Sequence, residues 1–90
     1  MAVSRNVIVA NREGLHLRAA TALAKTARQF KSTKMELVTD ELRVGCTEPL
    51  QIVTLGAEKG AEIRIEAEGP DAPAALDALV RLFESKFGED

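Results

Sequence analysis

The sequence predicts an α+β fold in one domain, residues 1–90, with four strands in one sheet and helices on one of its faces. Three observations support this fold. Ninety residues suit one domain with one modest core. Apolar and polar residues alternate strictly over residues 61–68, which is typical of a strand with one buried and one wet face. Apolar residues recur at helical spacing over residues 16–30 and again over residues 71–87.

Composition favours a globular protein and excludes several classes of function. Hydrophobic residues make up 46% of the chain and charged residues 29%, which argues against disorder. The net charge of −2 and the lack of a Lys/Arg run exclude a nucleic-acid footprint. No apolar run approaches the ~20 residues of a membrane span, and no signal peptide is evident, so we expect no membrane insertion. The single cysteine and single histidine predict a cytoplasmic chain without a metal site or cofactor.

The first half of the chain reads as strand, loop and helix. Residues 3–10 are rich in β-branched side chains and predict a strand, with Val7 and Val9 on one face and Ile8 on the other. Residues 11–14 interrupt that pattern and predict a loop. The helix is expected from His16 to Phe30, and its apolar stripe consists of Ala20, Leu23, Ala27 and Phe30.

The middle of the chain predicts a hairpin and a short helix. A second strand is expected over residues 35–39 and a third from Leu42, joined by a turn at residues 40–41 that lacks glycine. The short helix is expected to start at Glu48-Pro49 and to end at Gly56. Cys46, which precedes it, is expected to be a small buried apolar residue.

The last third predicts a strand and a long helix. Residues 61–67 form the clearest strand of the chain, and Gly69-Pro70 stops it. Asp71 is expected to cap a helix that Gly88 ends. Its apolar stripe consists of Leu76, Leu79, Val80, Phe83 and Phe87. Because each strand has one polar face, a mostly antiparallel sheet with one face open to water is expected.

The segment from Gly14 to Arg18 carries the candidate chemistry. The N–H groups in the first turn of a helix have no partners and attract an anion, so the backbone of Leu17, Arg18 and Ala19 is expected to form an anion hole. His16 can act as a nucleophile near neutral pH, and Arg18 can pair with phosphoryl oxygens. Gly14 is expected to let a partner or a phosphate come close. Read without any relative, the same residues also fit a plain helix start with a solvated arginine.

The run Gly14-Leu15-His16-Leu17-Arg18, followed by Ala19-Ala20, resembles the Gly-Leu-His-Ala-Arg-Pro-Ala site of the HPr family of phosphotransferase systems. The second half of the chain adds matching pieces in the same order and spacing. These pieces are Leu55-Gly56, Gly60, Ile63, Ile65 and Glu68-Gly69-Pro70-Asp71. The resemblance therefore covers nearly the whole chain.

The resemblance implies an open-faced β-sandwich, in which three helices cover one face of a four-stranded antiparallel sheet. It implies a phosphoryl relay rather than an enzyme. His16 would accept the group from enzyme I, on the ring nitrogen nearest the backbone, and Arg18 would support it. The recipient would be an EIIA domain of a sugar or nitrogen phosphotransferase system. The docking face would comprise Leu17, Thr21, Ala24, Lys25, Leu50, Gln51 and Thr54. We expect a monomer.

Two departures from the family pattern concern rigidity and regulation. Ala19 stands where the family has proline, and we expect this to change rigidity rather than phosphoryl binding. The serine that a regulatory kinase modifies in many members aligns with Glu48 when counted from Leu55-Gly56, and with Thr47 when counted from His16. Glu48 would supply a fixed negative charge there, or simply stabilise the helix start. This altered segment leaves open a second hypothesis: a regulatory module that signals its phosphorylation state to a kinase or transcription factor.

Overall fold

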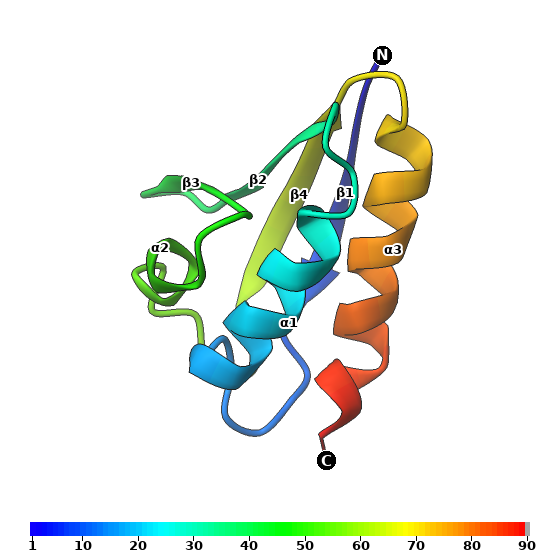
Figure 1. Cartoon of the computed structure of the whole chain (residues 1–90). Helices are drawn as coiled ribbons and strands as arrows, with labels where there is room; N and C mark the ends of the chain where they lie inside the picture. Colours follow the sequence, from blue (N-terminus) through cyan, green and yellow to red (C-terminus); the bar gives the residue numbers. More distant parts are fainter. Residues whose placement is uncertain (90) are drawn as a thin grey trace.

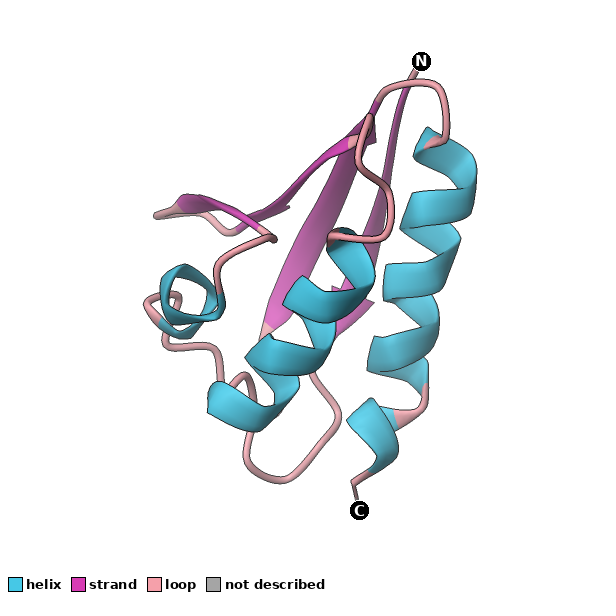
Figure 2. Cartoon of the chain, viewed as in Figure 1, coloured by secondary structure: helices cyan, strands magenta, loops and turns pink. Residues whose placement is uncertain are grey.

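The computed structural model describes residues 1–89. Its four strands form one antiparallel sheet, as predicted, and their spatial order is β1-β4-β2-β3. Figure 1 shows α1 and α3 side by side, with α2 beside α1, and Figure 2 shows all three helices on the same face of the sheet. The bounds are β1 Ala2–Ile8, α1 Leu17–Ala27, β2 Lys34–Val38, β3 Arg43–Gly45, α2 Pro49–Val53, β4 Glu62–Glu68, α3 Ala72–Glu84 and the short 3₁₀ helix η1 Lys86–Gly88.

The sheet puts its apolar residues on the helix-covered face, in register across three strands. Ile63 of β4 lies opposite Val7 of β1, and Ile65 lies opposite Leu37 of β2. All four side chains are buried. The charged residues that alternate with them in β4 point to the open face, so the period-two pattern of residues 61–68 is confirmed.

The first helix is shorter than its predicted span at both ends. His16 is the N-cap, so the helical residues begin at Leu17, one position later than expected. Arg28 is the C-cap, and the Phe30 N–H donates to the Ala27 carbonyl in a closing turn. The predicted stripe is otherwise confirmed, and the buried residues of this helix are Ala19, Ala20, Leu23, Ala24 and Ala27.

The β2–β3 hairpin turns without glycine because a threonine hydroxyl organises it. The Thr39 N–H donates to the Leu42 carbonyl at 2.8 Å. The N–H groups of Glu41 and Leu42 donate to Thr39 Oγ1 at 3.3 and 3.1 Å. The threonine hydroxyl thus accepts hydrogen bonds from two N–H groups of the turn. In a turn that contains glycine, backbone carbonyls alone would accept them. Thr39 therefore belongs to the turn and not to the second strand.

The end of the chain differs from its prediction. Asp71 occupies the N-cap position of α3 as expected, but its side chain makes no capping hydrogen bond. The helix ends at Glu84 rather than at Gly88, because Lys86 and Phe87 adopt left-handed φ values of 57° and 56°. This backbone reversal folds the Phe87 ring edge-to-face onto Phe83, with 5.0 Å between ring centroids.

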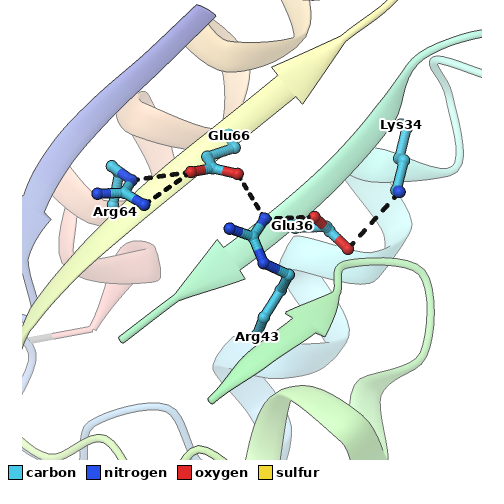
Figure 3. A network of polar contacts seen from close by, with 5 residues as sticks. All are labelled: Lys34, Glu36, Arg43, Arg64 and Glu66. Atoms are coloured by element: carbon cyan, nitrogen blue, oxygen red, sulfur yellow. Dashed lines mark hydrogen bonds and ion pairs between the residues drawn. The ribbon is translucent and has the colours of Figure 1, made fainter. Parts of the chain in front are cut away.

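Charges on the open face of the sheet neutralise one another. Figure 3 shows the Arg43 guanidinium between two carboxylates, Glu36 at 2.7 Å and Glu66 at 2.6 Å. Arg64 reaches the other oxygen of Glu66, and Lys34 reaches Glu36. The hydrogen bond from Arg43 holds the pKa of Glu66 below its usual range. The network joins β2, β3 and β4 on the face that no helix covers.

Cys46 is buried under α2, as the sequence predicts. Its N–H donates to the Met35 carbonyl at 3.1 Å, which continues the pairing of β2 and β3. Burial, with a smaller contribution from the charge of Glu36, raises the pKa of its thiol to about 12. The thiol therefore stays protonated and serves as a small apolar group.

Candidate functional site

His16 lies at the N-cap of α1, as the sequence predicts. Its backbone is extended, with φ −74° and ψ 179°, and its carbonyl accepts the Ala20 N–H at 2.9 Å. The imidazole makes no capping hydrogen bond, and the residue is exposed. The ring is therefore available to a partner protein while its backbone is held by the helix.

The first turn of α1 meets the geometric requirement for an anion hole. The bond from the Ala20 N–H to His16 is the first of the helix, so the N–H groups of Leu17, Arg18 and Ala19 precede every intrahelical bond. No acidic residue lies in this turn. The helix dipole adds positive potential at the same point, so an anion attached to His16 would be stabilised there.

Arg18 and His16 line two separate hollows that share no lining residue. Arg18 is exposed and borders a hollow of about 300 Å³ together with Arg12, Glu13 and Glu89. His16 borders the other hollow, of about 240 Å³, which reaches Val53 in α2. Among residues 1–89, no hydrogen bond joins the two side chains. Arg12 is a second guanidinium near this turn, and nothing in the sequence alone singled it out.

The expected role of Gly14 is wrong. Gly14 has a φ of +72°, and a Cβ there would lie 2.5 Å from the Ala57 carbonyl oxygen and 2.8 Å from the Glu58 Cα. The glycine thus makes room for the chain's own α2–β4 loop and not for a partner or a phosphate. The Leu15 N–H donates to that same Ala57 carbonyl at 2.9 Å.

Sequence reasoning also missed Asn11, which it placed in an ordinary loop. Its side chain is 0% exposed, and its Nδ2 donates to the Gly14 carbonyl at 2.7 Å. The Gly14 N–H in turn donates to the Asn11 carbonyl at 3.2 Å. A signal was present, because asparagine often closes a turn on a backbone group two or three residues later. Its burial depends on tertiary contacts and left no mark in the sequence.

Comparisons with known proteins agree with this geometry. A family model described as PTS HPr component phosphorylation site matches residues 3–85. The phosphocarrier protein HPr of Treponema pallidum is 40% identical, over 98% of this chain and 99% of that protein. The chain belongs to the HPr family.

Relatives and solved structures extend over almost the full length of the chain. The phosphocarrier protein NPr of Proteus mirabilis is 36% identical, over 96% of each chain. The crystal structure of HPr-C-His from Thermoanaerobacter tengcongensis matches with a TM-score of 0.91 at 35% identity, over 98% of each chain. As a member of the HPr family, this chain is a phosphoryl carrier of a phosphotransferase system.

The expected HPr docking face is exposed except for one residue. Leu17, Thr21 and Lys25 follow one another at four-residue spacing along the exposed side of α1. Leu50, Gln51 and Thr54 are exposed on or beside α2, where Ile52 alone is buried. Leu50 and Leu17 are 73% and 56% exposed, which is unusual for large apolar side chains. Ala24 was wrongly included, because it is 1% exposed and packs in the core.

Glu48, one of the two candidates for the family's regulatory position, has a paired carboxylate. Glu48 is the N-cap of α2, and its carbonyl accepts the N–H groups of Gln51 and Ile52. Its carboxylate makes no capping bond but lies 3.7 Å from the Arg28 guanidinium at the end of α1. Thr47 precedes it and is exposed. The pair connects the end of one helix to the start of the other.

Metal-binding clusters and membrane-spanning helices are both absent from residues 1–89. Within this part of the chain, no cluster of three or more His, Cys, Asp or Glu side chains could hold a metal ion. No helix there is long and apolar enough to cross a membrane.

Proposed function

We propose that His16 is the phosphoryl acceptor, that enzyme I is the donor, and that an EIIA domain receives the group. One observation carries this proposal: an exposed imidazole stands at the N-cap of α1, the helix whose first three backbone N–H groups have no intrahelical partner, and Arg18 is exposed two residues further along the chain. The geometry offers a nucleophile, an anion hole and a counter-charge within one helical turn.

The proposed reaction is a transfer of one phosphoryl group between proteins. A lone pair on the neutral His16 ring attacks phosphorus, a P–N bond forms, and the bond from phosphorus to the donor atom breaks. By resemblance the nitrogen is Nδ1, the one nearest the backbone. The N–H groups of Leu17, Arg18 and Ala19 and the Arg18 guanidinium balance the charge on the phosphoryl oxygens. The recipient then reverses these steps, so the chain is a relay and not a catalyst of its own reaction.

Partner recognition is assigned to two exposed helix faces. The apolar side chains of Leu17 and Leu50 would form the centre, and Thr21, Lys25, Gln51 and Thr54 would surround it. A regulatory kinase that modifies Thr47 is a further candidate partner. Glu48 is proposed to act as a fixed negative charge beside this face, and Arg28 moderates that charge. A monomeric, cytoplasmic chain remains our prediction.

The test is phosphorylation by phosphoenolpyruvate, magnesium and enzyme I of the same organism, followed by intact mass. We expect a gain of one phosphoryl group that acid removes and that His16→Ala abolishes. Thr47→Val is the matched control and should keep the full gain. No gain in the unmodified chain would overturn the carrier assignment. An acid-stable gain with ATP, lost in Thr47→Val, would favour the regulatory module instead.

A further inference from the structure

The peptide group between Gly14 and Leu15 is held at both of its ends. Its carbonyl oxygen accepts the Asn11 Nδ2–H at 2.7 Å. Its N–H donates to the Ala57 carbonyl in the α2–β4 loop at 2.9 Å. The Leu15 side chain that follows is buried in the core. The Gly14–Leu15 peptide group, which precedes His16 in the chain, is therefore held in one orientation.

Asn11 is the side chain that makes this arrangement specific. It is fully buried, and its Nδ2 also donates to Glu89 Oε1 at 3.3 Å. Among residues 1–89, its Oδ1 has no hydrogen-bond partner. The opposite orientation of the amide would set Oδ1 against two acceptors, the Gly14 carbonyl and the Glu89 carboxylate. Both neighbouring groups, the Gly14 carbonyl and the Glu89 carboxylate, therefore require a hydrogen-bond donor. The asparagine Nδ2 supplies it, and Oδ1 is left without a partner.

We propose that Asn11 is a positioning residue for phosphoryl transfer. It fixes the Gly14–Leu15 peptide, and thereby the angle at which His16 meets the first turn of α1. Because the helix holds the His16 carbonyl on the other side, the backbone of His16 is fixed from both directions before any partner binds. This inference rests on the proposed role of His16, and it names the residue that prepares that site.

The two acceptors that face Asn11 predict which substitution at this position disturbs the Gly14–Leu15 peptide more. Asn11→Asp keeps the shape but replaces the donor by a carboxylate that faces the Gly14 carbonyl and Glu89. Asn11→Ala removes the donor without adding a charge. We therefore expect Asp to disturb the Gly14–Leu15 peptide more than Ala does. A role limited to filling space would give the reverse order, because aspartate fills the site and alanine does not.

The matched control is Thr33→Val. It removes the hydrogen bond between another buried polar side chain and the backbone, at a place far from His16. Thr33 Oγ1 accepts the Asp71 N–H at 3.3 Å, in the loop beyond the other end of α1. All variants are compared at a temperature where circular dichroism shows each to be folded. The readouts are kcat and KM for the chain as a substrate of enzyme I, and amide hydrogen exchange of Leu15.

For both Asn11 variants we expect kcat to fall about tenfold or more, because misalignment affects the transition state, while KM changes little. The Leu15 amide should exchange faster in the Asn11 variants than in Thr33→Val. Equal kcat in all three variants, or losses that only follow stability, would overturn the proposal. Leu15 exchange needs no phosphoryl transfer. If the unmodified chain were not phosphorylated while Leu15 exchange still responded to Asn11, the failure would lie in the proposed function.

Discussion

At the scale of single residues, the loop before His16 does its work through backbone contacts. Gly14, Leu15 and Ala57 bring two loops together, and Asn11 closes the turn that leads to Gly14 within the first of these loops. None of these residues offers chemistry to a phosphoryl group. They hold the backbone that leads into His16, the proposed phosphoryl acceptor, at the start of α1.

The first prediction concerns Gly14. Gly14→Ala should lower the free energy of unfolding by about 3 kcal/mol, because a left-handed backbone and a collision with the Ala57 carbonyl act together. Gly60→Ala is the matched control, since Gly60 has a φ of +95° but open space around it. It should cost only about 1–2 kcal/mol. Urea unfolding measures both, and an equal loss in the two variants would contradict the close packing at Gly14.

At the scale of elements, the short strand β3 is attached to the sheet by side-chain contacts as well as by its few backbone hydrogen bonds. It is a three-residue edge strand, and Arg43 ties it to Glu36 of β2 and to Glu66 of β4 (Figure 3). Exposed ion pairs contribute little singly, but one guanidinium shared between two carboxylates forms a network. This network and the Thr39 hydrogen bonds both support the hairpin, whose turn lacks glycine.

The second prediction concerns the pH dependence of this network. The pKa of Glu66 is lowered in the folded protein, so its contribution to stability is present above the unfolded pKa of about 4.3. That contribution is lost as the pH falls through the lowered folded pKa. Glu66→Gln should therefore flatten the loss of stability between neutral and acid pH. Glu68→Gln, on the same face of β4, should leave it unchanged. Thermal unfolding from pH 7 to pH 3 measures both, and identical profiles for all three proteins would contradict the network.

At the scale of the whole molecule, most of the fold could be predicted because periodicity records burial directly. The alternation over residues 61–68 and the stripe of α1 follow from the two sides that each element presents. The reversal at Lys86 and Phe87 could not be predicted, because it is driven by Phe87 packing on Phe83. Ala24 was misplaced because the family resemblance put it on the docking face, whereas its spacing from Ala20 and Ala27 puts it on the buried stripe.

The candidate site divides in the same way. His16 and Arg18 could be singled out because the run from Gly14 to Arg18 resembles the HPr site, whereas their place at a helix start also fits a plain helix start. Asn11 and the contact of Gly14 with Ala57 could not, since they join segments more than forty positions apart or depend on complete burial. Sequence therefore indicates the residues proposed to touch the phosphoryl group, while the structure identifies those that hold the backbone before them in place.

The most direct test of the account is NMR of the protein labelled with ¹⁵N-histidine, before and after reaction with phosphoenolpyruvate and enzyme I. Because the chain has one histidine, every imidazole signal belongs to His16. We expect the Nδ1 resonance of His16 to move to the position of a phosphorylated nitrogen. The backbone amides of Leu17, Arg18 and Ala19 should shift with it. An unchanged imidazole in a protein that has gained a phosphoryl group would contradict the account.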